Sequence, residues 1–419
     1  MTQNTKFPLP VTGIDMLSTE TAMSKGSVRI ATNVDIERSG AFKRRVGRSI
    51  AKAGANYHSI YSAPQRGSMF VCNGVSLNRL QPDMTETPVA TLNSPDPVSY
   101  VEYNGNLYWT NSTTTGWLPV DGGVARPIGV PGLPVTPTPT VVSGGLLPGR
   151  YTFVFTRLDD RREESGATDP IIVDLPNGGG VRFSGFPLAI GTVVRIYMSD
   201  PDGEVPHVAA EVPGVFPTYT VTESARGGDC TTKYLRSMPP GDFITWMAGR
   251  LYTAKNDTLY FSDALRPHLY NPAHNFIKFS GFISFVEPVT DGLYVGDSRG
   301  VWFLSGLDPT KFTQSYVSSN RAVVGSAIRV PAGFFDDRVV QSPNTTVAWL
   351  GVNGYSVGQD SGTITNLQDT RIRLSPGLRG KSVLVVRDGI KQLITPVNTP
   401  AVATSGTAID STINNEVQA

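Results

Sequence analysis

The feature that most constrains the fold of this chain is a repeated pattern of a short strand, a tight polar turn and a second short strand. In each copy the strands mix β-branched and aromatic residues, which fit a pleated sheet well. Clear copies span residues 105–118, 249–263, 292–305, 346–357 and 382–394, and a weaker copy spans residues 69–80. One twisted hairpin cannot bury both of its faces, so we expect these hairpins to stack against one another.

The spacing of the hairpins suggests how they stack. Several recur at intervals of roughly 40 to 55 residues, which suits the four-stranded blade of a β-propeller. The 43 glycines and 32 prolines of the 419 residues favour turns and disfavour helix interiors. The sequence therefore predicts an all-β chain with a β-propeller body. Because the period is irregular, an ordinary multi-sheet β fold remains the alternative.

The hairpin pattern is interrupted after residue 130. The segment 131–139 (PGLPVTPTP) is expected to be a stiff, extended connector, because proline restricts its own backbone angles and those of the residue before it. Six short strands follow within roughly 100 residues, the size of a fibronectin or Ig-like β-sandwich. Their expected positions are residues 150–157, 170–175, 181–184, 192–198, 207–211 and 218–222.

These patterns predict four parts of the chain. Residues 1–133 form the first part of the propeller, residues 134–232 an inserted fibronectin-like sandwich, and residues 233–395 the second part of the propeller. Insertion is tolerated because the two ends of a sandwich can lie close together. Residues 396–419 are expected to be an extended tail, disordered in isolation because it has few apolar anchors. The one helical turn we expect follows Ser262, between Asp263 and Pro267.

Charge and cysteine content narrow the class of protein. The 36 basic and 35 acidic residues nearly cancel, so no overall field draws the chain onto nucleic acid or a membrane. Charged residues make up 17%, below the roughly 25% of typical soluble domains, which suggests surface covered by neighbouring subunits.

Cys72 and Cys230 lack CxxC spacing and are interpreted as free thiols. Neither a signal peptide nor a long apolar run is present, so we expect a soluble protein without membrane insertion.

No arrangement of residues in the sequence predicts catalysis. The histidines, His58, His207, His268 and His274, form no HExxH, and neither GxSxG nor a P-loop occurs. His268 and His274 have only Asp263 nearby as a third metal ligand, so we interpret them as structural. The acidic residues of LDDRREESG (158–166) are interpreted as a solvated turn, and the polar turns at 255–257 and 296–298 lack the full Asp-box pattern. We therefore expect a protein that is not an enzyme and needs neither cofactor nor metal.

The most distinctive segment is basic and lies near the amino terminus. Eight basic and two acidic residues fall between Lys25 and Lys52. We interpret residues 33–36 as a strand, Ser39-Gly40 as a turn and residues 42–45 as the returning strand. A second interpretation remains open, in which basic side chains contact the phosphates of DNA. The residues concerned are Lys43, Arg44, Arg45 and Arg48.

This segment also carries a family resemblance. The string SVRIATNVDIERSGAFKRRVGR resembles the opening hairpin of the tail nozzle and packaged-DNA stabilisation proteins of short-tailed bacteriophages. Residues 249–263 and 292–306 are similar to the propeller strands of those proteins, and residues 149–166 to their inserted fibronectin-like domain. The matching residues of the hairpin are Asn33, Val34, Asp35, Gly40, Arg44, Arg45 and Gly47.

The resemblance implies a structural virion protein that is assembled in the bacterial cytoplasm. Subunits would form a ring, commonly a homohexamer, that lies in the tail below the portal and adaptor. Such a ring would continue the DNA channel, let DNA pass through its lumen without sequence specificity, and help to retain the genome until ejection.

Two other classes of function remain open. One is a glycan-binding or depolymerising propeller of a tail fibre or spike, in which tryptophans stack on sugars. The candidate tryptophans are Trp109, Trp117, Trp246 and Trp302. The other is a sialidase-like enzyme, against which the incomplete Asp boxes count.

Overall fold

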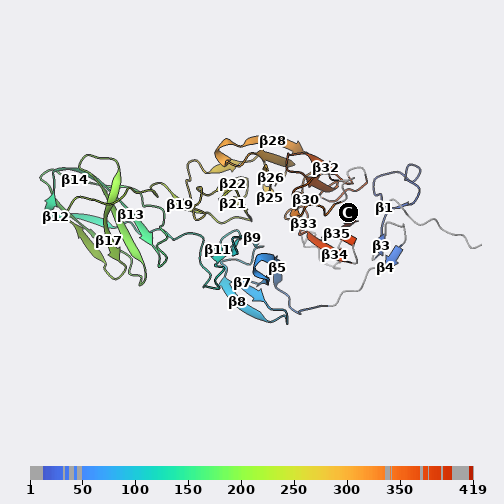
Figure 1. The fold of residues 1–419 in the computed structure, drawn as a ribbon, viewed down its shortest axis with the longest axis horizontal. Helices are drawn as coiled ribbons and strands as arrows, with labels where there is room; N and C mark the ends of the chain where they lie inside the picture. Colours follow the sequence, from blue (N-terminus) through green and yellow to red (C-terminus); the bar gives the residue numbers. More distant parts are fainter. Residues whose placement is uncertain are drawn as a thin grey trace, which may run out of the picture. The chain divides into compact units, whose positions relative to one another are not determined.

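A computed structural model describes residues 13–31, 34–36, 42–44, 50–335, 340, 342–368, 371–375, 377–387, 390–398 and 415–418. Within these residues almost all regular structure is β-strand (Figure 1). The helical elements described are two 3-10 turns, η1 (Pro64–Arg66) and η2 (Pro309–Lys311). The chain divides into two compact units, a first unit of residues 1–55 and 279–419 and a second unit of residues 56–278.

The second unit contains three antiparallel sheets in up-and-down order, the strand order of a propeller blade. The first consists of β5 (Tyr57–Ala63), β6 (Ser68–Asn73), β7 (Ser76–Leu80) and β8 (Glu86–Thr91). The second consists of β9 (Ser99–Tyr103), β10 (Asn106–Thr110) and β11 (Thr115–Leu118). The third consists of β20 (Phe243–Met247), β21 (Arg250–Lys255), β22 (Thr258–Phe261) and β24 (Phe276–Lys278).

These three sheets pack face to face. Phe70 of β6 and Trp109 of β10 belong to one buried cluster, and Tyr108 of β10 and Leu251 of β21 belong to the next. Both faces of the middle sheet are therefore covered, and its central strand β10 is buried from Leu107 to Thr110. This burial explains why the hairpin strands are so rich in aromatic residues.

The first unit repeats this arrangement. Its first sheet consists of β25 (Ile283–Val289), β26 (Gly292–Asp297), β27 (Val301–Ser305) and β28 (Thr313–Ser318). The second consists of β29 (Ile328–Val330), β30 (Thr346–Gly351), β31 (Gly354–Gly358) and β32 (Ile364–Asn366). The third consists of β34 (Val383–Arg387), β35 (Ile390–Thr395) and β37 (Asn415–Gln418). Trp349 of β30 packs with Tyr294 of β26, and Leu350 of β30 shares a cluster with Leu393 of β35.

Several two-stranded pairings complete the described sheets. They are β1 (Gly13–Ile14) with β2 (Ser27–Val28), β3 (Val34–Ile36) with β4 (Phe42–Arg44), β19 (Arg236–Ser237) with β23 (Leu269–Tyr270), and β33 (Arg379–Gly380) with β36 (Val397–Asn398). The β1–β2 pair is parallel, and the others are antiparallel.

Between the blade sheets of the second unit, the chain forms two further sheets (green in Figure 1). One holds β12 (Thr138–Leu146), β15 (Gly179–Ser184) and β18 (Thr218–Val221). The other holds β14 (Ile171–Leu175), β13 (Gly149–Leu158), β16 (Val193–Ser199) and β17 (Pro206–Pro213), in that order. We call these two sheets the sandwich, because they enclose a shared buried core.

Aromatic side chains dominate the core of the sandwich. The ring of Phe183 meets those of Phe153 and Phe155 edge to face, with centroids 4.8 and 4.9 Å apart. Such edge contacts are favourable because the positive edge of one ring meets the negative face of another. All three side chains are fully buried.

The all-β fold class with propeller-type sheets is confirmed, and each of the six predicted hairpins is present. They are β6–β7, β10–β11, β21–β22, β26–β27, β30–β31 and β34–β35. The six sandwich strands expected from sequence are also present, whereas β12 was missed because its first residues were interpreted as a connector. The boundaries at residues 133 and 232 remain predictions, since the sandwich lies within the second unit.

One expectation is wrong. Residues 263–266 form a turn with a bridge between Asp263 and Arg266, not a helical turn, and Leu265 has a φ of 59°, outside the helical region. In the carboxy-terminal segment, β36 and β37 are strands that pair with β33 and β35, and the extended tail stays a prediction.

Candidate functional site

The basic hairpin predicted from sequence is described in part. Strand β3 pairs with β4, so that Val34 lies opposite Arg44 and Asp35 opposite Lys43. The Arg44 side chain is exposed. Of the other residues singled out, Asn33, Gly40, Arg45, Gly47 and Arg48 lie outside the described residues. The strands of the hairpin are thus as expected, and a contact of Arg44 with DNA stays a prediction.

The densest set of charged contacts surrounds residues 159–164, which we call the charged loop. Its shape follows from its first residue, because Asp159 Oδ1 accepts hydrogen bonds from the backbone N–H groups of Arg161 (2.9 Å) and Glu163 (2.8 Å). Aspartate commonly closes turns in this way. Arg162 has a φ of 66°, which tightens the turn further. The loop leaves β13 and contacts both the sandwich and the blade sheets of the second unit.

On the side of the blade sheets, three residues of the charged loop find partners. Arg126 donates to both carboxylate oxygens of Asp160, at 2.5 and 2.9 Å, and these hydrogen bonds hold the pKa of Asp160 at about 2. The Arg161 guanidinium lies 5.3 Å from the centroid of the Trp117 ring, a cation–π contact. Glu163 Oε1 lies 3.0 Å from Nδ1 of His268.

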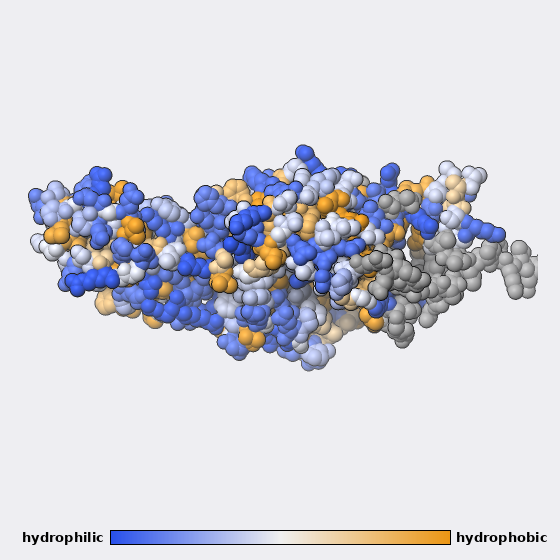
Figure 2. All heavy atoms as spheres, turned by 45° about the horizontal axis from the view of Figure 1, so that its top comes forward, coloured by the Kyte–Doolittle hydropathy of each residue, from blue (hydrophilic) through white to orange (hydrophobic). Residues whose placement is uncertain are grey.

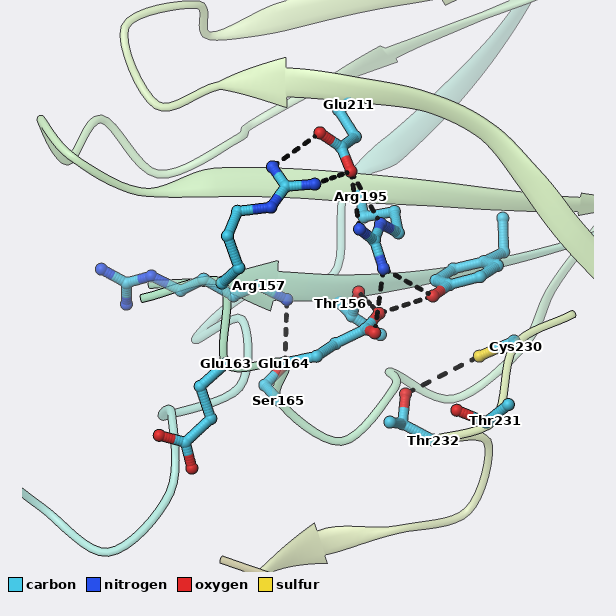
Figure 3. Close-up of polar contacts among 12 residues, drawn as sticks. Thr156, Arg157, Glu163, Glu164, Ser165, Arg195, Glu211, Cys230, Thr231 and Thr232 are labelled. Carbon is cyan, nitrogen blue, oxygen red and sulfur yellow. Dashed lines mark hydrogen bonds and ion pairs between the residues drawn. The ribbon is translucent and has the colours of Figure 1, made fainter. Parts of the chain in front are cut away.

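On the side of the sandwich, Glu164 is the centre of a hydrogen-bonded network (Figure 3). Glu164 Oε1 accepts from the hydroxyls of Thr156 (2.5 Å) and Tyr197 (2.6 Å), and Oε2 accepts from Arg195 (3.0 Å). Arg195 also donates to Glu211. Burial raises the pKa of Tyr197, and the neighbouring Glu164 carboxylate raises it further, so the phenol stays protonated.

Glu211 completes the network at its outer side. It accepts from Arg162 of the charged loop at 2.7 and 2.9 Å, and from Arg195 at 2.6 and 3.0 Å. The Arg162 hydrogen bonds, assisted by Arg195, lower the pKa of Glu211 to about 2. Two guanidinium groups therefore share one carboxylate, an arrangement that fixes all three side chains.

The interpretation of these acidic residues as a solvated turn needs correction. The carboxylates of Asp160, Glu163 and Glu164 each have a cationic or imidazole partner outside the loop. The contacts of Asp160 and Glu163 tie the charged loop to Arg126 and His268 outside the sandwich, whereas those of Glu164 stay within the sandwich. Sequence reasoning missed this role because the partners lie more than 30 positions away, and only the alternation of charge in DDRREE indicated that ion pairs would form.

The remaining histidines also have ordinary environments. His58 Nε2 lies 2.9 Å from the carbonyl oxygen of Gly74, His207 Nδ1 lies 2.8 Å from Asp229, and His274 is exposed. Among the described residues, no three His, Cys, Asp or Glu side chains gather where they could hold a metal ion. No helix within the described ranges has the length and apolarity to cross a membrane.

The polar turn at 296–298 is built from its aspartate. Asp297 is fully buried and accepts from the N–H groups of Arg299 (2.7 Å) and Gly300 (2.9 Å) and from Nε1 of Trp302 (3.1 Å). Its carboxylate is therefore committed to shaping the β26–β27 turn, in agreement with the interpretation of this motif as a turn.

No family model and no curated protein matches this chain. Among solved structures it is similar to BBS1N in complex with ARL6DN (11% identity, 83% of this chain and 94% of that chain, TM-score 0.33), to Kluyveromyces lactis Hsv2 (9%, 85% and 95%, TM-score 0.28), and to BamB from Moraxella catarrhalis (14%, 78% and 76%, TM-score 0.29). At identities and TM-scores this low, the likenesses carry no argument about function.

Proposed function

We propose that this chain is a structural subunit of a virus particle, a tail nozzle protein of a short-tailed bacteriophage that assembles as a ring around a DNA channel. The observation that carries the proposal is the order of elements along the chain, in which blade sheets are followed by a sandwich and then by further blade sheets. The segments that resemble the phage family fall on matching elements, residues 249–263 on β21–β22 and residues 149–166 on β13 and the charged loop.

The charged loop supports a mechanical role. Arg126 binds Asp160 and His268 contacts Glu163, so the charged loop is tied to residues outside the sandwich by side-chain contacts as well as by the chain itself. A nozzle needs a subunit that keeps its shape under the pressure of packaged DNA, and it requires no chemical reaction. Hydrogen-bonded charge networks of this kind make a connection rigid.

Exposed apolar residues support assembly with further copies. The loops at residues 185–192 and 213–217 hydrogen-bond to each other through their backbones, and we call them the apolar ledge. Ile190 is 94% exposed, and Leu188 and Phe216 are more than half exposed. Figure 2 shows exposed hydrophobic residues at several places on one face of the chain. A closed ring repeats one interface by rotation, and burial of such side chains would stabilise it.

The net charge of +1 suits a channel through which DNA must pass. Each phosphate contact by a lysine or arginine adds affinity, and a strongly basic lumen would hold DNA back during ejection. In this proposal portal, adaptor and other tail proteins are the partners, and DNA is contacted without sequence specificity.

Electron microscopy of the purified protein and of the intact particle tests the proposal. We expect a ring with an axial channel, commonly sixfold, at the axis of the tail. Ile190→Asp should prevent the ring from closing while the subunit stays folded, whereas Leu265→Asp, at another exposed position (84%), should leave the ring intact. The absence of the protein from purified particles, or a ring without a channel, would overturn the assignment.

The tail-fibre alternative depends on tryptophans that can reach a glycan. Trp109 is buried, Trp302 packs between Phe279 and Tyr316, and Trp246 stacks on Tyr103 with centroids 3.7 Å apart. These rings contribute to cores and inter-sheet packing instead. Robust degradation of a capsular polysaccharide by the purified protein would favour the alternative over the nozzle.

A further inference from the structure

Strand β28 forms the open outer edge of its sheet in the first unit. The sheet order is β25-β26-β27-β28, so β28 has one strand neighbour, β27 (Figure 1). The two strands pair in regular register from Thr313 to Tyr316, and a bulge follows at Val317. Among the described residues, no backbone group of residues 313–316 hydrogen-bonds outside this pairing. Alternate residues of the stretch therefore direct their N–H and C=O groups away from the sheet, where another strand can pair with them.

Both faces of this stretch are accessible as well. The side chains of residues 313–316 are all exposed, and Tyr316 is 49% exposed. Because successive side chains of a strand point to opposite faces, four exposed residues in a row mean that neither face of the stretch is buried. An incoming strand could therefore lie along the edge in the plane of the sheet.

Four other outer strands of the blade sheets have features that hinder such pairing. Strand β8 contains the charged Glu86 and also Pro88, which cannot donate a backbone hydrogen bond. Strands β24 and β32 have three residues each, and a bridge from Arg126 to Trp117 covers part of β11. Proline, charge, short length and covering are the means by which proteins prevent the sheet edges of two copies from pairing.

Strand β28 has none of these features. Its six residues, TQSYVS, include neither a proline nor a charged residue, and its bulge lies after the regular stretch. The contact that the other edges hinder, pairing with an identical chain, is therefore tolerated at β28. An antiparallel pair of two β28 strands also brings no like charges together, because the strand itself is uncharged.

We propose that β28 is a self-association edge, at which the β28 strands of two copies pair antiparallel and join their sheets into one. The occupant of the edge is thus the same strand of a second copy. Such a contact is twofold, because both copies contribute the same residues. It is therefore distinct from the repeated interface of a closed ring, and it does not depend on the proposed nozzle function.

Opposite charges placed at one position test this pairing. Ser315 lies near the middle of β28, so its two copies come close to each other in an antiparallel pair. Sedimentation velocity of the full-length chain, with Ile190→Asp as the reference chain so that ring closure does not interfere, should show concentration-dependent dimers. We expect Ser315→Lys alone and Ser315→Glu alone to weaken the dimer about tenfold, because like charges then meet. An equimolar mixture of the two variants should recover the affinity of the reference chain to within about threefold, because lysine then meets glutamate.

Thr87→Lys is the matched control, since it places the same charge at an exposed position of β8. It should leave the dimer unchanged, and thermal unfolding of each variant checks that the fold is retained. The proposal is overturned if the reference chain stays monomeric at every concentration, or if Ser315→Lys pairs as tightly as the reference chain. It is also overturned if the mixture pairs no better than either variant alone.

Discussion

At the scale of single residues, Glu164 connects three residues of the sandwich network, since its two carboxylate oxygens accept hydrogen bonds from Thr156, Tyr197 and Arg195. Its side chain is only 16% exposed, so solvent cannot replace the lost partners. We expect Glu164→Gln to lower the free energy of unfolding by about 2 kcal/mol, because Arg195 then loses a charged acceptor in a partly buried site. Denaturant unfolding of the full chain measures the loss.

A matched control for this prediction lies on the same sheet. Asp174 pairs with Arg150 at 2.8 Å, but both side chains are more than 60% exposed. Water screens such a pair, so Asp174→Asn should destabilise the chain far less than Glu164→Gln. Equal losses for the two variants would contradict a structural role for the buried network.

Glu211 makes the stability of the sandwich depend on pH. Its pKa is about 2 in the folded chain against an ordinary value of 4.5, because Arg162 and Arg195 stabilise the carboxylate. A depressed folded pKa contributes stability that is present above pH 4.5 and is lost as the pH falls towards 2. We therefore expect the denaturant concentration of half unfolding to drop less between pH 5 and pH 3 for Glu211→Gln than for the parent chain. A parallel drop in both proteins would show that other carboxylates dominate acid unfolding.

At the scale of elements, close contact between sheets depends on small residues at particular strand positions. A Cβ added at Gly358 of β31 would lie 2.6 Å from the ring of Tyr294 on β26, in the neighbouring sheet. That ring is fully buried and its hydroxyl donates to the carbonyl of Gln359 at 2.7 Å, so it cannot move aside freely. We expect Gly358→Ala to cost about 2 kcal/mol through overpacking.

Gly228 provides the comparison for this variant. An added Cβ there meets no atom within 4 Å, so Gly228→Ala should leave stability nearly unchanged. Thermal unfolding of the two variants side by side separates the packing effect from the general change of glycine to alanine. A similar loss in both variants would contradict the packing explanation, because the lower entropy of the unfolded alanine chain by itself favours folding.

At the scale of the whole molecule, the chain has several hydrophobic cores rather than one. The sandwich core around Phe183 and the blade core around Trp349 share no residues. Chains of this size commonly unfold in steps. We expect Phe183→Ala to cost about 4 kcal/mol and to speed amide hydrogen exchange in β13–β17 while β25–β31 exchange as before. Uniformly faster exchange across both regions would show that the cores unfold as one.

Much of this architecture follows from local sequence. The six hairpins and six of the sandwich strands were predictable because aromatic and β-branched runs flank turns rich in Gly, Asn and Asp, and those signals act over only a few residues. Strand β12 escaped prediction because its prolines and glycines suggest a connector, although its residues 138–142 pair with β15 in regular register. The prediction of a helical turn at Asp263 was wrong for a similar reason. Aspartate favours the start of a helix, but Asp263 instead forms a backbone bridge with Arg266.

The sequence by itself determined that the chain is all β, that its hairpins repeat, and that a second kind of β-structure interrupts them, because these properties depend on periodicity and turn residues. Only the tertiary structure decided what the charged loop does. Asp160, Glu163 and Glu164 look like solvated acids in sequence, and they become structural because Arg126, His268 and Arg195 are brought to them from distant positions in the chain. Ion pairs form between elements that chain folding brings together, so their partners cannot be inferred from local patterns.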